Sequence, residues 1–272
     1  MIIIQLTGGL GNQLFQYAIG KKLAIQNNTE LKLDTNFFKT YKWHEYSLTP
    51  FNIQTKYISI LNKFLIQKGI IKTYSENSFD CDISVLEIPN NTYLKGYFQS
   101  YKYFNDLRDE LLKDFTIKAE PSEKNKLYLN EITNCNSISL HIRRGNYINI
   151  EHVNKHHGVC SIDYYKKAIE IITNKISDPL FFVFSDDIQW AKNNLTFIKN
   201  IKYVEINDAK TDYEDLRLMA NCRHQIIANS TFSWWGAWLN KNINKIVIAP
   251  QKWINDSSIN TNDLIPNNWI RI

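Results

Sequence analysis

The feature that most constrains the fold is a regular alternation of strand-like and helix-like segments that begins at Asn136. Five short runs rich in Ile, Val and Phe have the length and composition of buried strands: SISLHIR, LFFVFS, IKYVEI, HQIIAN and KIVIAP. The segments between them have helical character: DYYKKAIEIITNKI, IQWAKNNL, YEDLRLMANC and FSWWGAWLN. Helical crossovers join parallel strands, so we predict an α/β fold with a doubly wound parallel sheet.

The first 130 residues begin in the same way, with the strand IIIQL, a glycine turn, the helix NQLFQYAIGKKLAIQ and the strand ELKLD. Further along, TYLKGYF predicts an extended segment and KYFNDLRDELLKDF a helix. In residues 40–90 the sequence does not predict an order of strands and helices. We therefore predict two α/β domains, residues 1–130 and 131–272, with parallel sheets that face a cleft.

The composition favours a folded protein with a small anionic ligand. Its net charge of +5 comes from 32 basic and 27 acidic residues, and the basic ones are scattered along the chain. This pattern argues against nucleic acid and suits a small anion or a peripheral membrane contact. No apolar stretch approaches the roughly 18 residues of a membrane span, and MIIIQLTGG lacks the features of a signal peptide. We expect a cytoplasmic protein that is at most peripheral at the inner membrane.

The cysteines are widely spaced and form no CxxC pair, which argues against a disulfide framework and a zinc ribbon: Cys81, Cys135, Cys160 and Cys222. His152, His156 and Cys160 would share one face of a helix. Gly158 and the polar surroundings favour a loop instead, so we expect no metal site.

Polar residues follow the predicted strands of the second domain at their carboxyl ends: Arg143 and Arg144, then Ser185, Asp186 and Asp187, then Asn207 and Asp208, then Asn229, Ser230 and Thr231. Ligands of doubly wound sheets bind in the crevice beyond these strand ends. Ser, Thr, Asp and Asn also cap helices, but that explanation does not apply to the two arginines. The pattern therefore favours a ligand-binding edge.

Arg143 is the strongest chemical clue at this edge. Strand alternation places it on one face with Ser139 and His141, opposite the face of Leu140. A guanidinium binds phosphate through bidentate hydrogen bonds and stays charged. A surface salt bridge is the alternative, but the end of a central strand favours an anion site.

Ser230 and Thr231 stand at the start of the predicted helix FSWWGAWLN. Unpaired backbone N–H groups and the positive end of the helix dipole favour an anion there. We expect the tryptophans behind them, including Trp234 and Trp238 on one face, to pack this helix into the core.

The segment TGGLGNQLFQYA follows a strand and opens a helix, as a dinucleotide fingerprint does, but Leu14 occupies the place of its third glycine. This argues against an NAD-dependent dehydrogenase. Gly9 and Gly11 would let the backbone approach a ligand, and Asn12 and Gln13 offer neutral groups suited to sugar hydroxyls. A tight turn without a ligand is the alternative.

Five segments, in the same order over nearly the whole chain, resemble the bacterial α-1,2-fucosyltransferases of glycosyltransferase family 11: GGLGNQLFQYA, GYFQSYKYF, HIRRGNY, FSDD and DLRLMANCRHQIIANSTFSWWGAWL. The resemblance implies a GT-B enzyme of bacterial surface glycan (O-antigen) synthesis. It implies transfer of L-fucose from GDP-fucose to the 2-hydroxyl of a galactose-terminated oligosaccharide acceptor, with inversion and without a metal or other cofactor.

The resemblance also implies roles for individual residues. Arg143 would bind the β-phosphate and stabilise the departing GDP, with His141 near the guanosine and Asp186 accepting hydrogen bonds from guanine. The other matches are the diphosphate loop, Ser230, Thr231 and Phe232, and the glycine loop near fucose and acceptor, Gly9, Gly11 and Asn12.

One position departs from the family pattern, because Asn146 stands where the family has aspartate. The charge is lost, so we expect Arg144 to be structural, held by carboxylates or carbonyls. No general base is evident; the candidates are Asp34, His44 and Glu45. We expect the determinants of the acceptor in residues 40–90 and in the segment YFQSY.

Two other functions share these features. A different nucleotide-sugar transferase would use the same arginine and hydroxyl groups with another base or sugar. A non-catalytic nucleotide- or sugar-binding protein would bind GDP without turnover.

Overall fold

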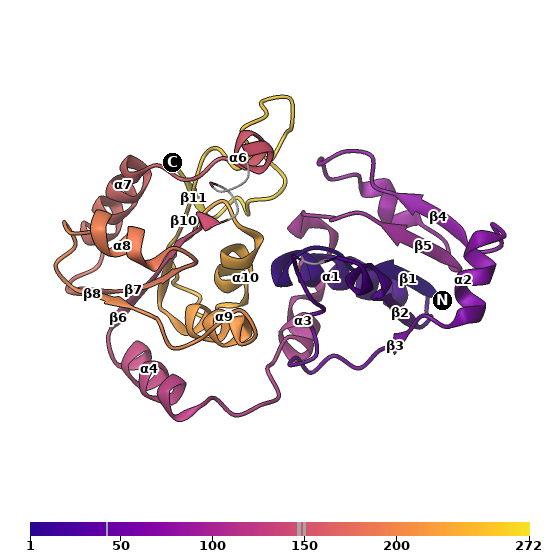
Figure 1. The fold of residues 1–272 in the computed structure, drawn as a ribbon, viewed down its shortest axis with the longest axis horizontal. Coiled ribbons are helices and arrows are strands. Elements are labelled where there is room, and N and C mark those ends of the chain that lie inside the picture. The colour runs from indigo at the N-terminus through magenta and orange to yellow at the C-terminus, as the bar shows by residue number, and fades with distance from the viewer. Residues whose placement is uncertain (42, 146–147, 149–150) are drawn as a thin grey trace. The chain divides into compact units, whose positions relative to one another are not determined.

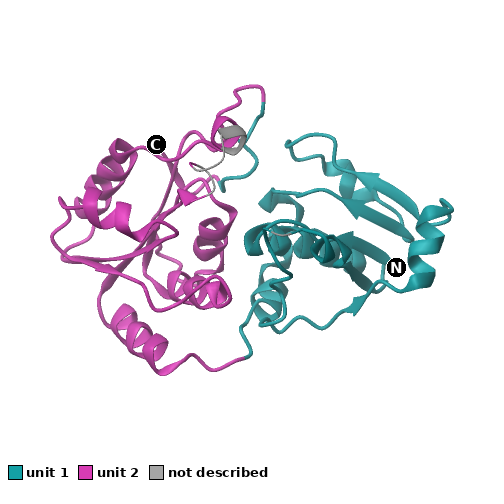
Figure 2. Cartoon of the chain, viewed as in Figure 1, with its two compact units in different colours: residues 1–118, 259–266 teal, residues 119–258, 267–272 magenta. Residues whose placement is uncertain are grey.

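The computed structural model describes residues 1–272 except residues 42, 146–147 and 149–150. The chain divides into two compact units, Met1–Lys118 with Ile259–Pro266 and Ala119–Ser258 with Asn267–Ile272 (Figure 2). The predicted boundary after residue 130 falls inside helix α4 (Glu123–Asn134), which packs against α9 (Asp212–Asn221) of the second unit. The units therefore separate before this helix.

The first unit is built on a five-stranded parallel sheet in the order β3-β2-β1-β5-β4 (Figure 1). Its strands are β1 (Ile2–Gln5), β2 (Leu31–Asp34), β3 (Lys56–Tyr57), β4 (Lys72–Ser75) and β5 (Thr92–Lys95). Its α-helices are α1 (Leu10–Gln26), α2 (Ile60–Gln67) and α3 (Arg108–Asp114). Four 3-10 turns complete it: η1 (Asn36–Lys39), η2 (Ile83–Glu87), η3 (Tyr101–Tyr103) and η4 (Asn105–Leu107). The segment without a predicted order thus contributes β3, α2 and β4.

The second unit contains a six-stranded sheet, also parallel, in the order β11-β10-β9-β6-β7-β8. Its strands are β6 (Asn136–Ile142), β7 (Pro179–Ser185), β8 (Ile201–Tyr203), β9 (His224–Ile226), β10 (Val247–Ala249) and β11 (Ile270–Arg271). Numbered from β6, this is the 3-2-1-4-5-6 order of a Rossmann fold, and it reverses between β6 and β9. The five predicted strands are confirmed; the short edge strand β11 was not predicted.

Helices cross between the strands of this second sheet: α6 (Glu151–His157), α7 (Ile162–Thr173), α8 (Ile188–Asn194), α9 (Asp212–Asn221) and α10 (Thr231–Leu239). The prediction of a loop before Gly158 was wrong, because the chain is helical through His157. Gly158 (φ +65°) marks the end of that helix.

The predicted two-sided character of β6 is confirmed. Ile138, Leu140 and Ile142 belong to a buried apolar cluster with residues of α7 such as Ile169 and Ile172. His141 is also buried, but its ring lies 5.7 Å from the ring of Phe232 at the start of α10. The strand thus presents an apolar face to α7 and polar side chains to the opposite face, which α10 helps to cover.

The tryptophans hold α10 in place. Trp234 and Trp238 share one face, as predicted, with centroids 6.2 Å apart and planes at 13°, and Trp235 lies 5.0 Å from Trp234 in an edge contact. Gly236 lets α9 approach, because a Cβ there would lie 3.1 Å from Cβ of Met219. Rigid aromatic packing therefore fixes the N-terminus of this helix.

Among the helices that the structure describes, none combines the length and apolar character needed to cross a bilayer.

Candidate active site

Arg143 follows β6 at the point where the strand order of the second sheet reverses. Its Nη1 lies 2.8 Å from Oδ2 of Asp186, which comes directly after β7, and the backbone N–H of Arg144 donates to Oδ1 of the same carboxylate at 2.8 Å. A side chain at Gly145 would lie 2.6 Å from that carboxylate. The carboxylate therefore positions the guanidinium beyond the strand ends, where ligands of such sheets bind.

Arg144 has the structural environment that we predicted. Its Nε contacts Oδ2 of Asp187 at 3.2 Å, and its guanidinium carbon lies 4.0 Å from the ring centroid of Trp190. Oδ1 of Asp187 accepts from the N–H of Trp190 and so caps α8. The two arginines are thus held by two successive aspartates. Asn146 lies outside the described residues.

His141 is kept neutral by its surroundings. Burial, with a smaller contribution from Arg143, lowers the pKa of His141 to about 4, although Asp186 opposes the shift. The backbone oxygen of His141 accepts from the Tyr165 hydroxyl at 3.2 Å. Within the described part of the chain, Nδ1 of His141 and Oγ of Ser139 have no hydrogen-bond partner. Both buried polar atoms belong to the same face of β6, and such atoms are costly unless a water or a ligand satisfies them.

Ser230 and Thr231 begin α10 next to β9, the neighbour of β6 in the sheet. Ser230 is the N-cap, but its hydroxyl does not cap the helix. Asn229 fixes this turn, because its Nδ2 donates to the carbonyls of His157, Gly158 and Trp253 at 3.0–3.3 Å. An uncapped helix N-terminus fixed in this way can accept an anion.

The structure also adds His157, a residue that the sequence did not single out. Burial, followed by the charges of His156 and Arg143, lowers the pKa of His157 to about 4. His157 was missed because the sequence analysis predicted a loop where the structure has α6. Arg143, His141, Asp186 and His157 thus belong to one electrostatic cluster.

Other polar residues at the strand ends are structural. Asp208 accepts hydrogen bonds within its own turn, from the N–H groups of Lys210 and Thr211. Asn207 donates to Asp215 at 2.7 Å and exchanges hydrogen bonds with Asn125. Of the predicted edge residues of this unit, Arg143, Asp186, Ser230 and Thr231 remain as those best suited to a ligand.

The glycine turn of the first unit is filled by its own chain. Gly8 has φ +71°, and a Cβ on Gly9 would lie 3.3 Å from the ring of His44. Gln13, predicted to face a sugar, is fully buried. Its amide holds the segment after His44, because Nε2 donates to the carbonyl of Glu45 at 2.8 Å and Oε1 accepts from the N–H of Ser47 at 2.9 Å. This residue is therefore structural. Gly11 is buried in the first turn of α1.

Asn12 lies beside the reversal point of the first sheet, between β1 and β5. Its Oδ1 accepts from Nε2 of Gln99 at 2.9 Å, which joins the turn after β1 to the loop after β5. That loop contains Phe98 at φ +51° and is held by Glu76, which accepts from the N–H groups of Tyr97 and Phe98. Burial raises the pKa of Glu76. Gln99 lies in the segment YFQSY, where we expect acceptor determinants, whereas Glu76 was not singled out from the sequence.

Asp34, one predicted candidate for a general base, is fully engaged in the first unit. It is buried, and its two oxygens accept from the Tyr93 hydroxyl at 2.8 Å and the N–H of Asn36 at 3.0 Å. His44 and Glu45 belong to the segment that Gln13 holds. No three His, Cys, Asp or Glu side chains in the described residues gather closely enough to bind a metal ion.

Comparison with known proteins identifies the family. The family model described as glycosyl transferase family 11 matches residues 1–272. The chain belongs to this family. It is 34% identical to the α-1,2-colitosyltransferase of Escherichia coli, over all of this chain and 99% of the relative. It is 26% identical to the galactoside 2-α-L-fucosyltransferase Sec1 of Mus musculus, over 88% of this chain and 64% of the relative.

The fold has solved counterparts. The structure of POFUT1 in complex with GDP aligns with a TM-score of 0.53 at 14% identity, covering 88% of this chain and 93% of that one. Together with the two parallel sheets, this likeness confirms the predicted GT-B fold of two Rossmann-like domains. This member of family 11 is therefore a glycosyltransferase.

The burial of His141 predicts a pH dependence of stability. Because its pKa is lowered from 6.5 to about 4, the unfolded chain binds more protons between these values than the folded chain. The free energy of unfolding should fall as the pH is lowered through this range, by on the order of 1 kcal/mol or more from this residue. Urea unfolding at successive pH values measures the slope.

The matched variants are His141→Gln, which should flatten this slope, and the exposed His156→Gln, which should change it much less, because His156 acts only as a secondary influence on the pKa of His157. An unchanged slope in His141→Gln would contradict the assignment of the neutral imidazole.

Proposed function

We propose that this glycosyltransferase moves L-fucose from GDP-fucose to the 2-hydroxyl of a terminal β-galactoside in bacterial surface glycan synthesis, with inversion and without a metal. The observation that carries the proposal is Arg143, held by Asp186 at the reversal point of a Rossmann sheet, with the N-terminus of α10 on the neighbouring strand. The fucose and the galactoside are supported by the family and by the name of the mouse relative.

The chemistry of these groups suits a departing diphosphate. Breaking the bond between sugar and phosphate leaves negative charge on the diphosphate, and a preorganised guanidinium with helix N–H groups stabilises that charge. Arg143 and the α10 N-terminus would therefore do what a divalent cation does in metal-dependent transferases. The neutral His141 adds no charge and would offer Nδ1 to the nucleoside, while Asp186 would position Arg143 and, as the family resemblance implies, contact guanine.

The proton of the acceptor hydroxyl has no assigned base. In the proposed reaction the acceptor oxygen attacks the anomeric carbon as the bond to the β-phosphate breaks, and the hydroxyl proton passes to solvent. Asn12 and Gln99, joined by their amides, would orient sugar hydroxyls by hydrogen bonds. Positioning of the sugars and stabilisation of the charge on the leaving diphosphate would then accelerate the transfer.

Arg143→Ala should lower kcat/KM for GDP release from GDP-fucose by about 10²- to 10³-fold, because it removes a preorganised charge from the leaving group. The assay contains EDTA, with lactose and Galβ1,3GalNAc as acceptors. The matched control is Arg223→Ala, since Arg223 is exposed and donates to Asn136 on the far end of β6. Equal activity of both variants, or turnover abolished by EDTA, would contradict the proposal.

Colitosyl transfer is a second candidate, favoured by the 34% identity to an α-1,2-colitosyltransferase. Colitose is fucose without its 3-hydroxyl, so a site that hydrogen-bonds this hydroxyl discriminates strongly against colitose. We expect kcat/KM for GDP-fucose to exceed that for GDP-colitose by about tenfold or more, measured by GDP release with the same acceptors. Faster turnover of GDP-colitose would assign the second donor, and binding of GDP without any turnover would indicate a binding protein.

A further inference from the structure

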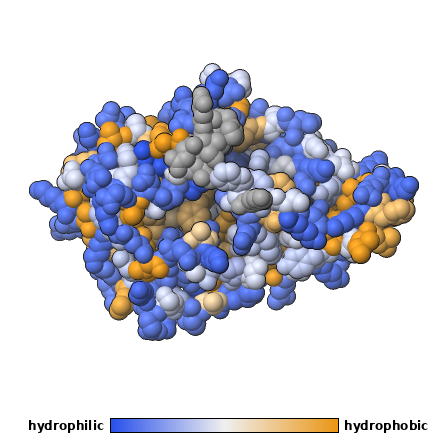
Figure 3. All heavy atoms as spheres, viewed as in Figure 1, coloured by the Kyte–Doolittle hydropathy of each residue, from blue (hydrophilic) through white to orange (hydrophobic). Residues whose placement is uncertain are grey.

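Helix α2 of the first unit exposes large apolar side chains to solvent and buries a polar one. Its one buried residue is Asn62, which is 3% exposed. Ile60, Leu61 and Phe64 are 87%, 63% and 50% exposed. Figure 3 shows hydrophobic surface gathered over this helix. Soluble proteins rarely leave such a group of large apolar side chains uncovered unless it meets a partner.

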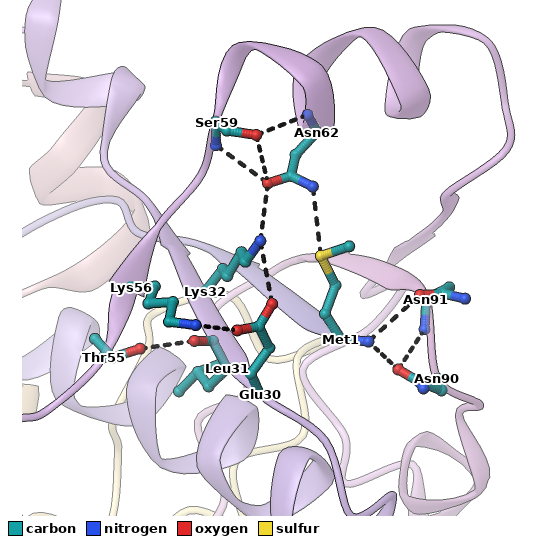
Figure 4. Close-up of polar contacts among 10 residues, drawn as sticks. All are labelled: Met1, Glu30, Leu31, Lys32, Thr55, Lys56, Ser59, Asn62, Asn90 and Asn91. Atoms are coloured by element: carbon teal, nitrogen blue, oxygen red, sulfur yellow. Dashed lines mark hydrogen bonds and ion pairs between the residues drawn. The ribbon is translucent and has the colours of Figure 1, made fainter.

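The inner face of α2 explains why the helix stays in this orientation. Ser59 and Asn62 form a reciprocal capping box, and Asn62 also accepts from Nζ of Lys32 at 3.3 Å and contacts Sδ of Met1 (Figure 4). Leu65 and Ile66 pack against the small cluster of Ile3, Ile71 and Tyr93. Polar and apolar contacts thus fix one face to the sheet, so the opposite face must point outward.

Positive charge borders the exposed face. Between Tyr46 and Ser75 the sequence has four lysines and no aspartate or glutamate. Lys56 pairs with Glu30 and Lys63 donates to Asn36. Lys68 lies 5.6 Å from the ring centroid of Phe64, and neither Lys68 nor Lys72 has an acidic partner among the described side chains.

We propose that the α2 patch, formed by Ile60, Leu61, Phe64 and Ile70 with Lys68 and Lys72, docks the protein on an anionic lipid surface. Ile70, which is 65% exposed, continues the apolar face just beyond the helix. Apolar side chains that enter the acyl boundary while lysines meet the head groups are the features of an interfacial helix. A symmetric pairing of two copies through this patch would bring like charges together, which favours lipid over a second copy.

This inference goes beyond the proposed function, since it depends on neither the donor nor the acceptor. Its test is co-sedimentation of the full chain with vesicles of equal parts phosphatidylcholine and phosphatidylglycerol, and with vesicles of phosphatidylcholine alone. We expect binding to the anionic vesicles that weakens at high salt, and much weaker binding to the neutral ones.

Two pairs of variants separate the contributions. The double change Leu61→Asp and Phe64→Asp should lower the partition coefficient at least about tenfold, and Lys68→Glu with Lys72→Glu should do the same. The matched controls are Ile243→Asp, at an isoleucine that is 94% exposed in the second unit, and Lys241→Glu beside it, each within about twofold of the wild type.

Three results would overturn the proposal: no binding to anionic vesicles, equal loss of binding in the control variants, or a dimer in static light scattering that the Asp variants dissociate. Transfer to a soluble acceptor, with circular dichroism to check folding, is measured in parallel. Because the patch lies within residues 40–90, where we expect acceptor determinants, a change in that activity tests the acceptor prediction and not the binding to vesicles. A chain that binds vesicles but transfers no sugar would contradict the proposed function. It would not contradict the proposed docking of the α2 patch on an anionic lipid surface.

Discussion

The pairing of β6 with neighbours on both sides is the constraint on which the candidate site depends. β7 and β9 flank this strand in parallel, and the chain order of the sheet reverses between β6 and β9. A reversal leaves the loops of the two strands leading in opposite directions, which opens a crevice at their carboxyl ends. Arg143 stands at one side of this crevice and the N-terminus of α10 at the other. The apolar cluster under β6 and the tryptophans of α10 keep both in place.

The contact between Arg143 and Asp186 fixes the position of the guanidinium charge before a ligand binds. A guanidinium has five N–H donors and can hold a carboxylate on one nitrogen and a phosphate on another. A lysine in this place could not divide its contacts in a planar fork. In the proposed reaction Asp186 would thus reduce the reorganisation that a bound phosphate has to induce, and preorganisation of this kind is a main source of electrostatic catalysis.

Much of the second unit was predictable from the sequence, because its strands are continuous apolar runs with polar residues at their ends. The loop predicted for HVNKHHGVC, residues 152–160, was wrong as far as His157, because Gly158 signals the end of a helix as readily as a loop. His157 was missed with it. In the first unit, β3 and β4 are short and mostly exposed, so no hydrophobic pattern marks them. Gln13 shows the limit most clearly, since its amide binds backbone groups more than thirty residues away, which no local pattern reveals.

The proposed function requires that a nucleoside diphosphate binds at the reversal point of the second sheet. Hydrogen–deuterium exchange with and without saturating GDP tests it most directly. We expect slower exchange in peptides that cover residues 141–144 and 229–233, with little change around α2 of the first unit. Slower exchange confined to the glycine turn after β1, or no change with GDP at either place, would contradict it.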